Sequence, residues 1–149
     1  MDALMKYIGR INRAAILHRS RLLKDDGVNG IAHSYILRIC QQPGITQDEL
    51  SKALYVHKSN VARQIAMLEE GGYLLRKPKE GDKRVLCIYP TEKMLAIYPK
   101  IRTLLDDWNT YLLEDFTLEQ AELLIDMLCV VLQKAQMQVE ADEGSEAKP

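Results

Sequence analysis

The chain has 149 residues, of which 47% are apolar and 28% are charged, a size and composition typical of one globular domain with its own core. It contains no run of about 18 apolar residues, and its first residues carry charges where a secretion signal needs an apolar stretch, so we expect a cytoplasmic protein without membrane contact. Its three cysteines (Cys40, Cys87 and Cys129) lie far apart without a C-x-x-C pair, and no disulfide framework is indicated.

The net charge of −1 is distributed unevenly along the chain. Residues 52–84 carry eight Lys and Arg against four Asp and Glu, whereas residues 85–149 carry five against twelve. Salt limits the reach of each charge to about 10 Å, so the local charge decides what a surface attracts. Residues 52–84 are therefore a candidate for contact with nucleic acid.

The first fifty residues predict three helices. Apolar spacing favours a helix over 4–25 that ends in the loop 25–30, and a second over 31–42 that stops at Pro43-Gly44. Thr46 and Glu49 have the spacing of a capping box, in which each side chain bonds the other residue's backbone amide. This box predicts the start of a short third helix over 47–53.

A fourth helix is predicted over 58–70, and Gly71-Gly72 supplies a left-handed end. Val61, Ile65 and Leu68 fall within one narrow sector of this helix and should face the core. Its outward side is polar, with Ser59, Asn60 and Arg63 near its centre and Lys58 and Gln64 at its margins.

Two runs of strand character follow, at 73–78 and 83–89, with Glu80-Gly81-Asp82 turning between them. A helix-turn-helix followed by a β-ribbon is the arrangement of a winged helix, which places one helix in the DNA major groove. We therefore predict a mainly α fold of the α+β winged-helix type.

The C-terminal part predicts two long helices. The first spans 91–115 and opens at Thr91, and the second spans 117–139 and opens with a capping box at Thr117 and Gln120. Together with 4–25, these helices carry more apolar surface than one winged helix can cover, and a second copy of the chain is the simplest cover. The last residues, 141–149, are polar and predict a disordered tail, and we find no internal repeat.

These features resemble the MarR family of bacterial transcription regulators. The resemblance covers about residues 4–140 and is sharpest in TQDELSKAL, in HKSNVARQIAMLEEGGYLLR and in the D-x-R pattern of Asp82-Lys83-Arg84. It implies one domain over 1–140, with a DNA-binding lobe at 30–90 and dimerisation helices at 4–25 and 91–139. It also implies a homodimer that binds a pseudo-palindromic operator, most often as a repressor. Where the family usually opens the recognition helix with Asp or Ser, this chain has His57.

The resemblance implies that Arg84 reaches into the minor groove and that Asp82 orients it. On the fourth helix, Arg63 can bind guanine and Asn60 can bind adenine, while the free amides at the start of the third helix attract phosphate. The predicted DNA-binding residues are Thr46, Gln47, Lys58, Ser59, Asn60, Arg63, Gln64, Lys79, Asp82, Lys83 and Arg84. The alternatives are a solvated helix face, a capping role for Thr46 and Gln47, and wing lysines that only solubilise an edge.

Family members commonly bind aromatic acids between the outer helices and the DNA-binding lobe, which implies an effector site at His18, Arg21, Tyr35 and Tyr98. An arginine suits a carboxylate and a tyrosine suits a ring, but both tyrosines serve equally well in a core and Arg21 on a surface.

Two other functions stay open: a winged-helix module that binds protein rather than DNA, and a cysteine-based redox sensor of the same family. Sensing members carry a cysteine near the start of the first helix, and this chain has none there. We find no nucleophile–base pattern, phosphate loop or metal motif, so we expect no catalysis, no cofactor and no metal.

Overall fold

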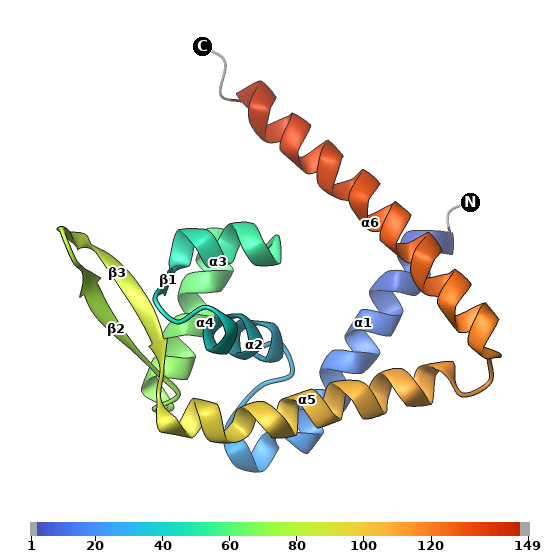
Figure 1. Ribbon diagram of the computed structural model, residues 1–149, viewed down its shortest axis with the longest axis horizontal. Helices are drawn as coiled ribbons and strands as arrows, with labels where there is room; N and C mark the ends of the chain where they lie inside the picture. The colour runs from blue at the N-terminus through green and yellow to red at the C-terminus, as the bar shows by residue number, and fades with distance from the viewer. Residues whose placement is uncertain (1–2, 147–149) are drawn as a thin grey trace. The chain divides into compact units, whose positions relative to one another are not determined.

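The structure is a computed structural model that describes residues 3–146 of the chain (Figure 1). Its elements, in chain order, are α1 (Ala3–Leu22), the 3-10 turn η1 (Lys24–Asp26), α2 (His33–Gln41), β1 (Ile45–Thr46), α3 (Gln47–Leu54), α4 (Lys58–Glu70), β2 (Leu74–Lys79), β3 (Asp82–Pro90), α5 (Glu92–Leu113) and α6 (Leu118–Glu146). The chain divides into two compact units, Met1–Asp106 and Asp107–Pro149, so the boundary lies within α5. The predicted fold class is confirmed.

The core of the first unit lies between α2, α3, α4, the sheet and the first half of α5. Val61, Ile65 and Leu68 of α4 are buried, as their spacing predicted. They pack in one cluster with residues of the other elements, among them Ile36, Leu50, Ile88 and Met94. Each fully buried aliphatic side chain of this kind contributes about 1.5–3 kcal/mol, so this cluster fixes how α4 is held.

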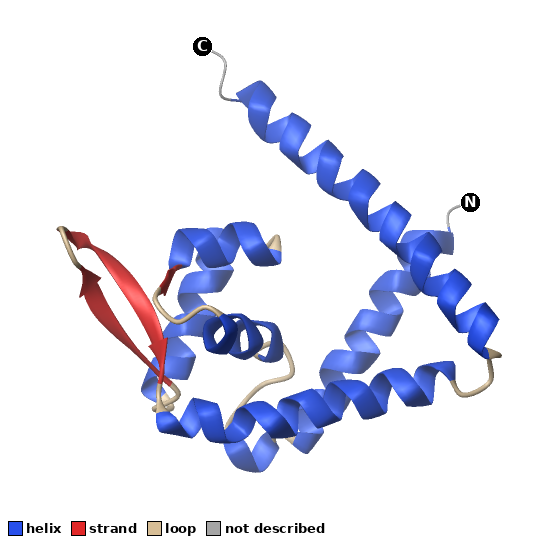
Figure 2. Cartoon of the chain, in the orientation of Figure 1, coloured by secondary structure: helices blue, strands red, loops and turns tan. Residues whose placement is uncertain are grey.

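Three antiparallel strands form the sheet in the order β1-β3-β2 (Figure 2). β2 and β3 pair along their length, from Leu74 opposite Pro90 to Lys79 opposite Asp82, with a register shift after Pro78. β1 is only two residues long and was not predicted; it pairs with β3 through Ile45 opposite Ile88. The ribbon β2–β3 is the wing, and β1 joins its base to the start of α3.

The end of α1 is joined to the loop before α2 by a buried arginine. Arg19 is 5% exposed, and its Nε donates to the Gly30 carbonyl at 2.9 Å. The Gly30 amide in turn donates to Ser20 Oγ at 2.8 Å. A Cβ on Gly30 would lie 2.1 Å from the Ile16 carbonyl oxygen, so only glycine allows this close approach of loop and helix.

The second unit contains the end of α5 and the helix α6. α6 runs to Glu146, past the predicted end at 139, so residues 141–146 are helical where the sequence predicted a disordered tail. Gln138 Nε2 donates to Asp142 Oδ1 at 2.9 Å, an i,i+4 contact that supports this last part. The remaining predicted tail, 147–149, lies outside the described residues.

Large apolar side chains of α6 are exposed along the helix in the single chain, namely Leu118, Leu123, Ile125, Met127, Leu128, Val130, Leu132, Met137 and Val139. α1 also exposes apolar side chains, at Leu4, Met5, Tyr7, Ile11, Leu17 and Leu22. Within residues 3–146, no helix is both long and apolar enough to cross a membrane.

Candidate nucleic-acid interface

Helix α4 begins at a histidine cap. His57 has extended backbone angles, and its Nδ1 accepts from the Ser59 amide at 3.2 Å and lies 2.8 Å from Ser59 Oγ. An imidazole nitrogen thus takes the place of the oxygen that Asp or Ser supplies at such a position. At the other end, Gly72 has φ +76°, the left-handed conformation in which the chain leaves the helix for the wing.

The first turns of α4 present polar side chains outward. Lys58, Ser59, Asn60 and Arg63 are all exposed. Ser59 and Arg63 stand on the side opposite Val61, with Asn60 beside them and Lys58 at the margin of this face. The hydroxyl, guanidinium and amide groups of Ser59, Arg63 and Asn60 are those that read base edges. The structure therefore keeps this face available for a partner.

Gln64 does not belong to this face, which corrects the sequence prediction. It is 7% exposed, and its Oε1 accepts from Asn29 Nδ2 at 3.3 Å. Gln64 follows Val61 by three residues and precedes Leu68 by four, so the helix turns it toward the buried side. Its carbonyl oxygen is met by an amide from the loop before α2.

The start of α3 is held by the predicted capping box. Thr46 Oγ1 accepts from the Glu49 amide at 3.2 Å, and Glu49 Oε2 accepts from the Thr46 amide at 2.9 Å. Gln47 is half-buried, and its Oε1 accepts from Arg76 at 3.4 Å. Both side-chain oxygens are thus engaged within the protein, which leaves the Gln47 side-chain NH2 group and backbone amides to meet a phosphate.

Lys58, at the start of α4, forms an exposed ion pair with α3. Its Nζ lies 3.2 Å from Asp48 Oδ1, with both side chains at least 70% exposed. Such a pair contributes little to stability, so Lys58 is free to exchange its partner for an anion.

The wing carries an oriented arginine near its tip. Asp82 Oδ1 accepts from the Arg84 backbone amide at 3.2 Å and from Arg84 Nε at 3.3 Å. The Arg84 side chain is 93% exposed, and Lys79 and Lys83 beside it are exposed as well. Because the pair is so exposed, it does not stabilise the fold appreciably; its effect is to direct the guanidinium.

Arg76 is partly exposed, but its charge is paired within the protein, which its place in the basic segment did not indicate. Its side chain is 30% exposed, forms an ion pair with Glu69 and reaches Gln47, so it adds no unpaired charge to the surface. The hydrogen bond from Arg76 holds the pKa of Glu69 below its ordinary value and raises the pKa of Arg76.

The four predicted effector residues have different environments. Tyr35 is 1% exposed and lies in the core, whereas Arg21 is exposed and His18 and Tyr98 are half-buried. The buried arginine of α1 is Arg19, which sequence reasoning missed. Its spacing from Ala15 and Leu23, both buried, is the signal that could have found it.

The cysteines occupy three different environments. Cys87 is buried, Cys129 is exposed on α6 in the single chain, and Cys40 is half-buried. Burial raises the pKa of the Cys40 thiol, which opposes formation of the reactive thiolate. Over residues 3–146, no three His, Cys, Asp or Glu side chains come together as a metal site would require.

Comparison with known proteins places these features in one family. A sequence model described as the MarR family matches residues 32–86, from α2 into β3. The uncharacterised HTH-type transcriptional regulator YybA of Bacillus subtilis (strain 168) is 30% identical over 128 residues, or 86% of this chain and 85% of YybA.

Two solved structures extend the likeness to most of the chain. The transcriptional regulator SlyA has a TM-score of 0.88 and 27% identity, covering 92% of this chain and 96% of its own. A MarR family transcriptional regulator from Listeria monocytogenes, complexed with 26mer DNA, has a TM-score of 0.85 and 27% identity, covering 95% of both chains.

Proposed function

Because the chain belongs to the MarR family, we propose that it is a homodimeric repressor that binds a pseudo-palindromic operator in double-stranded DNA. Proteins of this family regulate transcription by binding DNA and are not enzymes, and the same holds for this chain. The observation that carries the proposal is the exposed polar face of α4 beside the Asp82–Arg84 pair of the wing. DNA as the partner implies a cytoplasmic location.

In the proposed complex, α4 enters the major groove. Arg63 donates two hydrogen bonds to a guanine and Asn60 pairs with an adenine, while Ser59 contacts a base edge or phosphate. Arg84, directed by Asp82, enters the adjacent minor groove, where the negative potential attracts a guanidinium. The start of α3 meets the DNA backbone with its free amides.

The dimer follows from the exposed apolar helices. α6 alone exposes Leu118 by 75% and Val130 by 63%, which is costly for a helix that remains in water. A second copy related by a two-fold axis covers such a surface and brings a second α4 into use. Two recognition helices then read two half-sites about 34–36 Å apart, one turn of DNA.

A small-molecule effector, with an aromatic acid as its class, completes the proposal. Besides the residues predicted from the sequence, two buried groups support an acid. No carboxylate among the described residues forms an ion pair with Arg19, and the Tyr35 hydroxyl has no hydrogen-bond partner among them. An acid that met these groups would release DNA by changing the separation of the two α4 helices.

Binding to DNA from the chain's own promoter region tests the central claim. The affinity should fall steeply with salt, because contacts to phosphates release counterions, and a scrambled duplex should bind more weakly. If binding is absent, or equal for both duplexes, the proposal fails and the protein-interaction alternative is favoured. Light scattering on the purified chain tests the dimer separately.

A further inference from the structure

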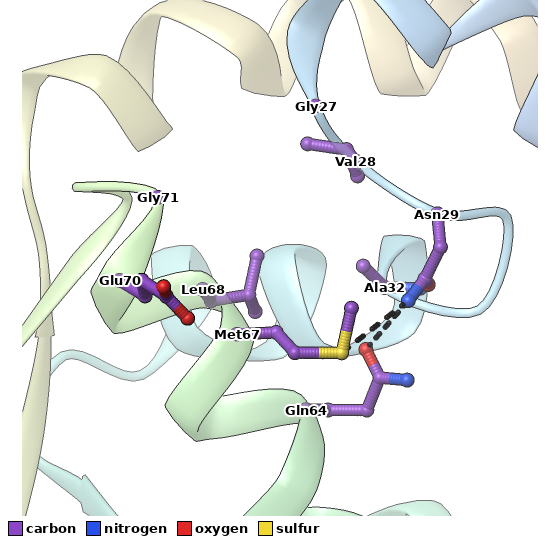
Figure 3. Close-up of a pocket in the computed structure, with 9 residues that line it drawn as sticks. All are labelled: Gly27, Val28, Asn29, Ala32, Gln64, Met67, Leu68, Glu70 and Gly71. Atoms are coloured by element: carbon purple, nitrogen blue, oxygen red, sulfur yellow. Dashed lines mark hydrogen bonds between the residues drawn. The ribbon is translucent and has the colours of Figure 1, made fainter.

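A pocket of about 260 Å³ lies beside the second half of α4, and its lining residue Met67 is one helical turn beyond Arg63. Its walls come from two segments far apart in sequence, the loop that follows η1 and the end of the recognition helix (Figure 3). The volume is slightly below the range of about 300–1,000 Å³ usual for ligand sites, so it suits a molecule of about one ring.

The loop side of the pocket is held in place by its own hydrogen bonds. Asn29 Oδ1 accepts from the backbone amides of Ile31 and Ala32, both at 3.0 Å. This arrangement leaves Asn29 Nδ2 to cross to α4, where it donates to Gln64 Oε1 and lies 4.0 Å from Met67 Sδ. Figure 3 shows both contacts spanning the pocket. These side-chain contacts therefore link the loop directly to the recognition helix.

Gln64 provides a hydrogen-bond donor that the protein does not use. Its side chain is 7% exposed and lines the pocket, yet no described residue accepts a hydrogen bond from its Nε2. Tyr35 Oη is the one fully buried, unpaired side-chain atom among the described residues, so water reaches Gln64 Nε2 in the free protein, and an acceptor that replaces this water keeps the donor bonded. A ligand acceptor is one way to supply that bond.

The charge that lines the pocket is negative. Glu70 is the one charged side chain among the described residues that line it, and the neighbouring cation, Lys93, has its Nζ bonded to the Gly71 carbonyl at 2.7 Å. The remaining lining is apolar, from Val28, Ala32 and Leu68, with the thioether of Met67. Sulfur and aliphatic groups make favourable contacts with aromatic rings, and a carboxylate at the edge favours a cation.

We propose that this pocket binds a small aromatic cation, a flat ring that carries a protonated amine or an amidinium group. The ring lies against Met67 and Val28, the cation pairs with Glu70, and an acceptor on the ring takes the Gln64 Nε2 hydrogen. This ligand class is opposite in charge to the aromatic acid proposed above, and its site is lined by α4 rather than by Arg19.

Three probes of nearly equal size test the binding: benzamidine, benzamide and benzoate. In an NMR titration of the full chain, benzamidine should bind with a Kd on the order of 1 mM, as expected for so small a ligand, and should shift the amide signals of Gly27, Asn29 and Gly71. Benzamide should bind more weakly, and shifts caused by benzoate should fall elsewhere, near Arg19. The proposal is overturned if benzoate matches benzamidine at these amides, or if benzamidine shifts none of them at about 10 mM.

Two substitutions locate the contacts. Glu70→Gln should weaken benzamidine about two- to five-fold and leave benzamide unchanged, as expected for a partly exposed ion pair. Glu80→Gln, which removes an exposed carboxylate from the wing turn outside the pocket, is the matched control and should change neither. Met67→Trp should block all pocket shifts, and Met67 is 49% exposed, so the fold tolerates the larger ring. If both glutamate variants lose the same benzamidine affinity, the effect is one of overall charge, and the proposed site is wrong.

A ligand in this pocket touches the recognition helix, so it should also change operator affinity. By linkage, operator DNA then changes benzamidine affinity by the same factor. This second part depends on the proposed function, whereas the titration without DNA does not. An operator affinity that is unchanged at saturating benzamidine would overturn the regulatory role, and loss of operator binding altogether would instead refute the proposed function.

Discussion

Arg76 of β2 forms a bidentate ion pair with Glu69 of α4, with Nε 2.7 Å from Oε2 and Nη2 2.9 Å from Oε1. The same guanidinium reaches Gln47 at the start of α3 through Nη1, at 3.4 Å. Because the guanidinium is planar and donates two parallel hydrogen bonds, it fixes the orientation of the carboxylate as well as its distance, which the single ammonium of a lysine cannot do. Arg76 therefore joins the wing, the recognition helix and the start of α3, the three elements proposed to meet DNA.

The first prediction is that Arg76 positions the interface without touching DNA. Arg76→Gln should weaken operator binding about three- to ten-fold while the dependence of affinity on salt keeps its slope, because no phosphate contact is lost. Arg76→Lys should restore little of the affinity, since an ammonium cannot form both bonds. If the slope of log affinity against log salt concentration falls in magnitude by about 1 in either variant, Arg76 contacts a phosphate directly, which contradicts the positioning role.

The second prediction separates base reading from phosphate binding. Arg63→Ala should cost about 1–3 kcal/mol of operator binding and relax the preference for one base pair, because a bidentate contact to guanine is removed. Lys79→Ala should weaken every sequence alike and reduce the salt slope. Fluorescence titration of the operator and of single-base variants measures both. If the two variants show the same change in base preference and in salt dependence, the proposal that α4 binds in the major groove is wrong.

The third prediction concerns the dimer. Val130→Glu places a charge on the exposed apolar surface of α6 and should produce monomers in light scattering, because a carboxylate desolvated in an apolar interface is costly. Operator affinity should fall in parallel, since one chain reads only half a site. Lys134→Glu, a change at an exposed polar position of the same helix, controls for charge. If the Val130 variant stays dimeric, the two chains meet elsewhere.

Local sequence patterns predicted most helices because each end carries its own signal. α4 spans 58–70 as predicted, since the chain turns at His57 before it and at Gly71-Gly72 after it. The pairing of β1 could not be predicted, because Ile45 is a strand residue only through Ile88, more than forty positions away. The pattern of apolar residues near Ile45 carries no information about so distant a partner.

The inward orientation of two polar residues was missed for a related reason. Arg19 and Gln64 both occupy the buried stripes of their helices, yet their polarity suggested exposure. One polar group of each is bonded by the loop before α2, Arg19 Nε by the Gly30 carbonyl and Gln64 Oε1 by Asn29. The sequence prediction therefore placed one residue too many, Gln64, on the exposed polar face of α4. The contact between Asp82 and Arg84, which the family resemblance implied, is present, while their role in DNA binding stays a prediction.

The fourth prediction tests the close approach of α1 to the loop. Gly30→Ala would bring its Cβ 2.1 Å from the Ile16 carbonyl oxygen, so backbone must move, at a cost of about 3 kcal/mol or more. For a chain of this size the melting temperature should fall by about 6–12 °C. Gly9→Ala, whose Cβ meets only the flexible end of Arg13 at 3.3 Å, should be neutral or slightly stabilising. Similar melting temperatures for both variants would contradict the packing.

The last prediction concerns His33, which lies beside the same loop. Burial, and then the positive charge of Arg19, lower the pKa of His33 to about 4, although a hydrogen bond between Nδ1 and the Gly30 carbonyl, 3.2 Å long, acts in the opposite direction. The unfolded chain therefore binds a proton near the ordinary histidine pKa of about 6.5, whereas the folded chain binds it only near pH 4. Between these values the unfolded state carries more protons, so stability falls as the pH falls.

At pH 4.5, this difference should remove at most about 3 kcal/mol of the free energy of unfolding measured at pH 7.5. His33→Asn keeps a side-chain N–H for the Gly30 carbonyl but does not titrate, and it should lose less stability over the same interval. Urea denaturation of both proteins at the two pH values gives the comparison, and the contributions of the carboxylates cancel in the difference. Parallel losses in the two proteins would mean that His33 accepts its proton as readily in the folded chain as in the unfolded one, and that the Arg19–Gly30 junction does not exclude water from it.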